Sequence, residues 1–379
     1  MNSKINFINT NPAKLSGLLK EIESIEGSGV YSNYGPINQS FENRAIEELF
    51  GGIGSCVTNC NATIGLMLAI KEATQSAKRK GRYAIMPSFT FAATAHAAIW
   101  AGLTPLLCDI DALTWSLDPD HENELIEKYG DEIAVIVPYA TFGTNIDLDR
   151  YETICCEKGI PTVVDAAASL GSKNAAGDGF GKGFNQSIVY SMHVTKTFST
   201  YEGGLIYSND AQRVKRLRAM GNFGFEQPRT ASLPGLNSKL SEIGSLIALK
   251  KLDSFKAIVE SRFTKANLYI DQLPDFKFQK QTGSITAYQF MPILLDANHA
   301  PKRMAIVEEM ASRGIMTANY FSPHIAEQSY FMETCVAERL TITNEIASRI
   351  LSLPLYENMS DEEVAFVAWN LRDIISTMS

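Results

Sequence analysis

The sequence lacks the long apolar runs and the surplus of positive charge that would point to a membrane or to nucleic acid. None of its apolar runs reaches the roughly 18 residues that a membrane-spanning helix needs. The first residues, Met-Asn-Ser-Lys-Ile-Asn-Phe, contain no apolar core of a secretory signal. The net charge is −8 at pH 7, so no overall positive field favours nucleic acid. We therefore expect a cytoplasmic protein with no membrane and no nucleic-acid partner.

Metal-binding clusters are also missing from the sequence. The chain has 6 Cys and 5 His among its 379 residues, and both are scattered. Cys56 and Cys60 have the spacing of half a metal site, but no second pair of Cys or His completes it. We expect no bound metal, and we interpret the cysteines as small apolar residues kept reduced in the cytoplasm.

Short apolar runs alternate with helical patterns from about residue 55 to residue 210. Runs rich in Val and Ile without polar alternation are typical of strands buried on both faces, which are mostly parallel. We expect strands at 83–87, 105–108, 133–139, 162–165, 187–191 and 205–208, and helices at 62–73, 92–101 and 148–158. Ligands of such sheets bind beyond the carboxyl ends of the strands, where Pro87, Tyr139, Asp165 and Ser191 lie.

The pattern changes after about residue 240. One long helix is expected over 241–268, followed by strands near 276–279 and 286–295 and by helices at 303–312 and 361–376. We therefore predict an α/β protein with two parts. The large, mostly parallel sheet domain covers residues 1–250, and a smaller α+β C-terminal domain covers residues 251–379, with the boundary inside the long helix.

A lysine and an acid follow two of the expected strands. Asp165 ends the apolar run Pro161-Thr-Val-Val, and Lys196 lies in a short loop between two further strands. Such an acid could pair with the protonated nitrogen of a pyridine ring, while the lysine amine forms a Schiff base. Taken alone, Lys196 is equally a solvated loop lysine, as most lysines are.

Three further segments have both a structural and a functional interpretation. The turn Thr58–Gly65 could present N–H groups to an anion at a helix N-terminus, or Asn61 or Thr63 could simply cap that helix. The aromatics of Pro87–Thr94 could stack on a planar cofactor or fill the core. Asn237 or Ser241 could cap the long helix.

In this order, the segments resemble the DegT/DnrJ/EryC1/StrS family of nucleotide-sugar aminotransferases, which are pyridoxal-phosphate (PLP) enzymes of fold type I. The similarity extends over nearly the whole chain. Each motif is weak alone, but their shared order makes chance implausible. The similar motifs are Gly35-Pro36, Phe41-Glu42, Asn61–Leu66, Pro87–Thr94, Gly102–Asp109, Asp165-Ala-Ala167, Ser191-x-His-x-x-Lys196, Glu202-Gly-Gly204, Gly235-x-Asn237, Ser241-Glu242 and Leu353–Tyr356.

The resemblance implies a role for each matching residue. Lys196 is similar to the Schiff-base lysine, Asp165 to the acid that holds the pyridinium nitrogen, and Phe91 to an aromatic over the ring. Contacts with the cofactor phosphate are implied for Ala62, Thr63 and Ser191.

The resemblance also implies an assembly. Asn237 aligns with a residue that reaches the phosphate of the neighbouring subunit's cofactor. The family pattern therefore implies an obligate cytoplasmic homodimer with two shared active sites.

Two positions depart from the family pattern. Ala168 stands where family members often have a glutamine near the ring hydroxyl, so Ser169 or water is left to supply that hydrogen bond. The stretch Val137–Gly143 lacks the family's common His, so no substrate role of that His carries over.

The lysine motif bears on the substrate. Ser-x-His-x-x-Lys followed by Glu-Gly-Gly resembles enzymes that aminate C4 of 6-deoxy-4-keto sugars, whereas the Pro-Gly-Lys-Asn-Leu-Gly pattern of C3 enzymes is absent. We expect transfer from L-glutamate to dTDP-4-keto-6-deoxyglucose, for O-antigen or related glycan synthesis. A UDP-linked 4-keto sugar is the close alternative, and a C3-keto sugar is a further one. Tyr34 and His324 are expected near the substrate, although His324 is also interpretable as a loop histidine with internal partners.

Three rival classes remain. PLP-dependent sugar dehydratases that resemble this family carry His in place of the lysine, so Lys196 argues against that activity. A non-enzymatic regulator would need a DNA-binding helix or basic stripe, and the sequence shows neither. Another fold-type-I enzyme, such as a decarboxylase, would differ by not requiring an amine donor.

Overall fold

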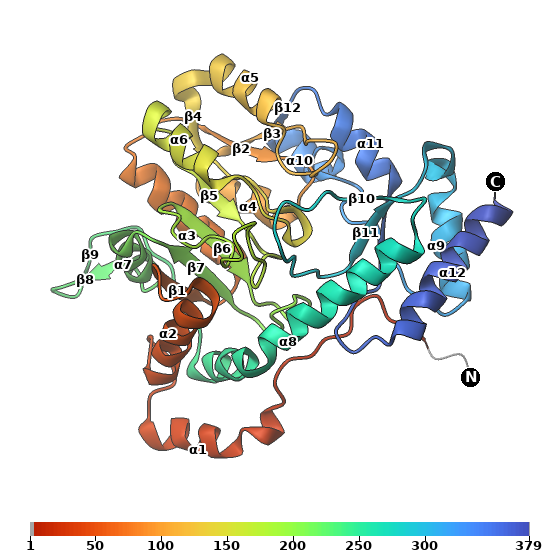
Figure 1. The fold of residues 1–379 in the computed structure, drawn as a ribbon. Coiled ribbons are helices and arrows are strands. Elements are labelled where there is room, and N and C mark those ends of the chain that lie inside the picture. Colours follow the sequence, from red (N-terminus) through yellow and green to blue (C-terminus); the bar gives the residue numbers. More distant parts are fainter. Residues whose placement is uncertain (1–3, 379) are drawn as a thin grey trace.

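The expected sheet is present in the computed structural model, which describes residues 4–378 (Figure 1). Two four-stranded sheets, β1-β7-β6-β5 and β4-β2-β3-β12, are joined because bridges pair Ile136 with Thr162 and Tyr139 with Asp165 in parallel. The strands are β1 (Ser55–Asn59), β2 (Tyr83–Pro87), β3 (Thr104–Cys108), β4 (Ile133–Ile136), β5 (Val163–Asp165), β6 (Ser187–Ser191), β7 (Gly204–Ser208) and β12 (Val336–Ala337). The predicted α/β fold is confirmed, and the predicted strand ends Pro87, Asp165 and Ser191 are observed.

One strand of this sheet reverses direction. β7 is antiparallel to both of its neighbours, β1 and β6. The connection of residues 192–203 contains no helix and returns the chain at the edge where β6 ends, whereas a parallel pair would need a crossover to the opposite edge, usually through a helix. The loop that carries Lys196 therefore lies at the edge where the parallel strands end.

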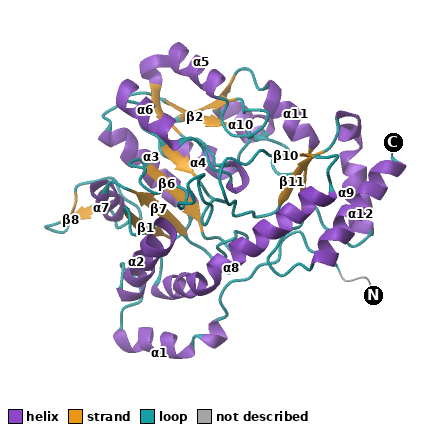
Figure 2. Ribbon diagram, viewed as in Figure 1, coloured by secondary structure: helices purple, strands orange, loops and turns teal. Residues whose placement is uncertain are grey.

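Helices cover both faces of the sheet (Figure 2). One face packs on α3, α4 and α7, and the other packs on α2, α5, α6 and the first half of α8. Their bounds are α2 (Pro36–Phe50), α3 (Ala62–Ser76), α4 (Ala92–Trp100), α5 (Pro119–Tyr129), α6 (Leu148–Lys158), α7 (Ala211–Met220) and α8 (Glu242–Gln272), and α1 (Leu19–Ser28) lies outside this layer. Within residues 4–378, no helix has the length and apolar character required to cross a bilayer.

The C-terminal part is a smaller α+β unit at the far end of α8 (Figure 1). An antiparallel sheet of order β10-β11-β13 packs on α9, α12 and the second half of α8. The elements are β10 (Lys277–Phe278), β11 (Met291–Leu294), α9 (Arg303–Ser312), α10 (Ser329–Thr334), α11 (Thr341–Arg349), β13 (Ile350–Leu353) and α12 (Asp361–Thr377). A short hairpin, β8 (Phe225–Glu226) and β9 (Thr230–Ala231), projects from the large unit.

The strand expected at 286–295 is shorter than predicted. β11 begins only at Met291. Residues 287–289 stay outside the ladder because side chains take their carbonyls: Thr197 donates to Ala287 and Tyr288, and Arg262 donates to Tyr288 and Gln289. A hydrophobic pattern cannot reveal such competition from distant side chains.

The packing departs from a division at residue 250 in two places. Ile5 pairs with Ile315 and belongs to the core of the smaller unit. Conversely, β12 extends the large sheet beside β3, and Phe331 of α10 packs in the core of the large unit. The division 1–250 and 251–379 stays a prediction, since the chain crosses between the two cores more than once.

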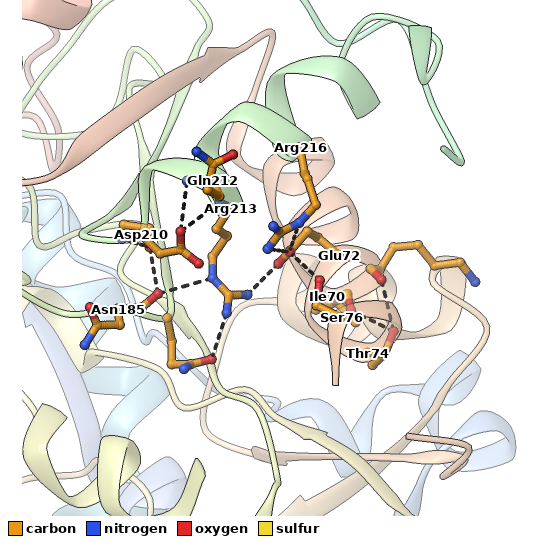
Figure 3. Close-up of polar contacts among 12 residues, drawn as sticks. Ile70, Glu72, Thr74, Ser76, Asn185, Asp210, Gln212, Arg213 and Arg216 are labelled. Atoms are coloured by element: carbon orange, nitrogen blue, oxygen red, sulfur yellow. Dashed lines mark hydrogen bonds and ion pairs between the residues drawn. The ribbon is translucent and has the colours of Figure 1, made fainter. Parts of the chain in front are cut away.

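A buried ion-pair network joins α7 to α3 on one face of the sheet (Figure 3). The carboxylate of Glu72, only 1% exposed, receives Arg213 on one oxygen and Arg216 and Ser76 on the other. Arg213 also donates to the carbonyl of Asn185. Both oxygens of the buried acid are thus bonded, which is the condition under which a buried charge is tolerated.

Glu72→Gln should therefore lower the free energy of unfolding by about 3 kcal/mol, because two arginines lose their buried counter-charge. Urea denaturation followed by circular dichroism measures this change. Glu260→Gln is the matched control, because the ion pair of Glu260 with Lys256 is exposed and should contribute little. Equal effects of the two substitutions would contradict the role given to the network.

Candidate active site

Asp165 ends β5 as a buried acid with only part of its bonding capacity used. Its side chain is 2% exposed. One carboxylate oxygen accepts the Thr94 hydroxyl at 2.6 Å, and the other accepts the Ala167 N–H at 3.1 Å. Loss of hydration raises the pKa of Asp165 from its usual range, against the effect of these donors and of the Lys196 charge. A carboxylate has room for further donors, so a protonated ring nitrogen fits here.

Lys196 lies in the loop between β6 and β7 and is partly buried. Its amine is directed at the side chain of Gln289, which precedes β11. Its Nζ donates to Oε1 of Gln289 at 3.0 Å. Loss of hydration lowers the pKa of Lys196 to about 8, and the negative charge of Asp165 opposes this shift. The lowered pKa increases the fraction of free amine near neutral pH, and a Schiff base and proton transfer both require the free amine.

The turn before α3 satisfies both interpretations given above. Asn61 caps the helix, since its side-chain oxygen accepts the N–H of Ile64 at 2.9 Å. Ala62 and Thr63 occupy the first turn, where backbone N–H groups have no intrahelical partner and the helix dipole attracts anions. The cap and the anion site are therefore compatible.

The sheet register brings Ser191 to this turn. Ser191 pairs with Gly204, and Gly204 pairs with Asn59 on the next strand. A Cβ at Gly204 would lie 2.7 Å from the carbonyl carbon of Asn61 and 2.8 Å from the nitrogen of Ala62. Only glycine lets the turn approach β7 so closely. A phosphate fits at the first turn of α3 beside Ser191.

The two phenylalanines after β2 have different environments. Phe89 is fully buried among aromatic residues and belongs to the core. Phe91, at the N-cap of α4, is 57% exposed, and its ring centroid lies 6.5 Å from that of Phe321. Phe91 and Phe321 line a cavity of about 340 Å³, formed by residues 90–92, 318–323 and Gln328. Phe91 is therefore free to stack on a planar ligand, and Phe89 is not.

His324 and Tyr34, the two residues predicted to contact the substrate, have their polar groups bonded within the chain. His324 is 1% exposed, and its ring nitrogens already bond Ser88 and Asn344, each at 2.8 Å. It supports the loop after β2, so its expected substrate role gains no support. The Tyr34 hydroxyl donates a hydrogen bond to the Arg218 carbonyl at 3.4 Å, and the Arg218 guanidinium lies over the Tyr34 ring.

Asn237 lies on the surface of this chain. Its side chain is exposed, and its backbone bridges to Asn222. It does not cap the long helix, because Ser241 does so by accepting the N–H of Gly244.

Two of the sequence motifs prove to be structural supports. Glu242 accepts the N–H groups of Ile37 and Asn38 at 2.9 and 3.0 Å and so caps α2, and a side chain at Gly35 would collide with it. Asp109 likewise accepts the N–H groups at the start of α11. Both carboxylates therefore find their partners at helix N-termini.

Gln289 is the functional neighbour that sequence patterns did not reveal. It was expected inside a strand, where alternate residues point to opposite faces. Its contact with Lys196 depends on the irregular path of residues 287–289, for which the sequence carries no local signal.

Together, the mostly parallel sheet, the buried acid, the lysine loop and the helix N-terminus at the start of α3 are the features of a PLP-dependent enzyme of fold type I. The chain belongs to the DegT/DnrJ/EryC1/StrS aminotransferase family, whose model matches residues 15–372. Its cofactor is pyridoxal 5′-phosphate.

Solved structures and curated relatives agree with this membership. A Bacillus cereus protein named as a candidate PLP-dependent aminotransferase is 37% identical, with a TM-score of 0.91, covering 98% of this chain and 100% of that one. DesI, solved with its TDP-sugar product, is 28% identical, with a TM-score of 0.86, covering 100% and 96%. The dTDP-4-amino-4,6-dideoxy-D-glucose transaminase of Escherichia coli is 27% identical over 93% of both chains.

In the cofactor-free protein, Lys196 should titrate with a midpoint near its pKa of about 8, below the roughly 10.4 of a free lysine. Asp165→Asn should lower the midpoint further, because the desolvation remains while the opposing negative charge is lost. The extent of acetylation at increasing pH, measured on the Lys196 peptide by mass spectrometry, tests both shifts. Lys256, which is 84% exposed, is the internal reference. A wild-type midpoint like that of Lys256 would contradict the described environment.

Proposed function

We propose that this enzyme transfers the amino group of L-glutamate to C4 of a nucleotide-linked 4-keto-6-deoxy sugar, with dTDP-4-keto-6-deoxyglucose as the favoured substrate. The observation that carries the proposal is the Lys196 amine with its lowered pKa, in the field of the buried acid Asp165. The dTDP-sugar named for the Escherichia coli relative and the TDP-sugar bound to DesI support the substrate class.

Each residue has a distinct task in this proposal. The bound cofactor supplies an electron-accepting ring. Asp165 holds a proton on the ring nitrogen, which requires a buried negative charge at the end of β5. Lys196 binds the cofactor, and its free amine moves a proton between the substrate carbon and the cofactor. Ala62, Thr63 and Ser191 hold the phosphate, and Phe91 stacks on the ring.

Glutamate as donor, the homodimer and the pathway also belong to the proposal. Asn237 is exposed, and its backbone bridges to Asn222, just before the β8–β9 hairpin, which suits a residue directed at a partner subunit's phosphate. The product would serve O-antigen, lipopolysaccharide or related glycan synthesis. Nucleotide sugars are soluble metabolites, so the proposal includes a cytoplasmic location.

The purified enzyme, supplied with PLP and L-glutamate, should aminate dTDP-4-keto-6-deoxyglucose, with 2-oxoglutarate as co-product. Product mass and NMR identify the aminated carbon and its configuration. UDP-linked 4-keto and C3-keto sugars form the other arms, and turnover of one of these alone would correct the substrate.

Lys196→Ala should give no product and lose the visible absorption of the lysine-linked cofactor. Asp165→Asn should still bind the cofactor but react several orders of magnitude more slowly. If the wild-type enzyme forms no amino sugar from any of these substrates, the proposal is overturned.

Mixed dimers test the shared active site. Lys196→Ala and Asn237→Asp homodimers should both be severely impaired, the second because a carboxylate would repel the phosphate. After the two proteins are unfolded and refolded together, about a quarter of the sites should be native, because half of the dimers are hybrids with one intact site. Recovery measured on the amino-donor half-reaction needs no sugar. Absence of recovery, with hybrids demonstrated by differently tagged subunits, would show that Asn237 acts within its own subunit or not at all.

A further inference from the structure

A short segment of the smaller unit clasps the loop that carries Lys196. The Thr197 hydroxyl lies 3.1 Å from the Ala287 carbonyl and 3.0 Å from the Tyr288 carbonyl. The next residue, Gln289, reaches the Lys196 amine through its side chain. The lysine loop is therefore held at two consecutive residues by three consecutive residues from a distant part of the sequence.

The clasping segment is itself fixed from behind by α8. Arg262 donates to the carbonyls of Tyr288 and Gln289, each at 3.2 Å. The same guanidinium pairs with Glu357 at 2.8 Å, and the two side chains are only 4% and 8% exposed. A buried, paired guanidinium has little freedom, so the backbone of Gln289 has a defined position.

The chemistry of the Gln289–Lys196 contact is specific. Gln289 is 8% exposed, and its side-chain oxygen accepts an amine hydrogen at 3.0 Å. An amide oxygen only accepts hydrogen bonds, so it binds either protonation state of the amine without occupying the nitrogen lone pair. A neutral amine anchored through one N–H keeps its lone pair for a substrate proton.

We propose that Gln289 is a positioning residue that holds the released Lys196 amine in a reactive orientation during proton transfer. This inference rests on the role of Lys196 in the proposed function and adds a residue to it. The lysine side chain has four rotatable bonds, and without the amide oxygen its amine would sample many orientations. Gln289 therefore acts on the reaction through the lysine and needs no contact with the substrate.

Gln289→Leu keeps the approximate size of the side chain and removes the acceptor. It should lower kcat by on the order of 10- to 100-fold, with a much smaller change in KM, because misplacing a reacting group by about 1 Å costs rates of this size. The amino-donor half-reaction, followed by the absorbance of the bound cofactor in single turnovers, measures this loss without any sugar substrate. Gln212→Leu, at an exposed position of α7, is the matched control and should leave the rate unchanged.

Gln289→Glu separates positioning from packing. It keeps the acceptor oxygen and adds a negative charge, which stabilises the protonated amine and raises the pKa of Lys196. The pH at which the half-reaction reaches half its maximal rate should rise in this variant, and so should the midpoint of Lys196 acetylation in the cofactor-free protein. At high pH the rate should exceed that of Gln289→Leu.

Two results would overturn the proposal: an unchanged half-reaction rate in Gln289→Leu, or equal losses in the Leu and Glu variants with no change in the Lys196 titration. The second result would assign Gln289 to packing alone. Neither readout uses a nucleotide sugar, so failure of the sugar assignment, seen as no amino sugar from the wild-type enzyme, is recognised separately.

Discussion

The structure depends on a buried carboxylate whose charge must be compensated. Asp165 is almost fully buried, and the removal of a carboxylate from water is costly unless donors surround it. Thr94 on α4, Ala167 behind β5 and the Lys196 charge on the β6–β7 loop each supply part of the compensation. A pyridinium N–H would supply a further part. Burial raises the pKa of Asp165 and lowers the pKa of Lys196, so one desolvated region shifts the pKa of both groups.

Much of this arrangement could be predicted because it depends on strand ends. Apolar runs without alternation locate buried parallel strands, and the residues that follow them meet at one edge of the sheet. The positions of Asp165, Ser191 and Lys196 could be predicted in that way. The direction of β7 could not be predicted in this way, because a buried apolar run reads the same in an antiparallel strand as in a parallel one. The contact of Gln289 with Lys196 could not be predicted either, since the position of Gln289 results from the hydrogen bonds that Thr197 and Arg262 make with residues 287–289.

Family motifs mix two kinds of constraint that a sequence alone does not separate. In the proposed function, Lys196 and Asp165 act in the chemistry. Glu242 and Asp109 instead cap helices that would otherwise leave backbone N–H groups without partners. His324, with both ring nitrogens bonded inside the protein, belongs with this second group. The distinction follows from where each polar group finds its partners: the supports are satisfied within the chain, whereas the chemical groups keep bonding capacity directed at the site.

The two cores of the molecule are coupled at the lysine. Both units pack on α8, which carries Arg262, and Arg262 fixes the segment that clasps the Lys196–Thr197 loop. Any rotation of the smaller unit relative to the sheet would therefore pull on the amine as well as on the cleft. Asp165, by contrast, belongs to the sheet and would stay in place. The distance between acid and base thus depends on how the smaller unit packs, and the buried Arg262–Glu357 pair is part of that packing.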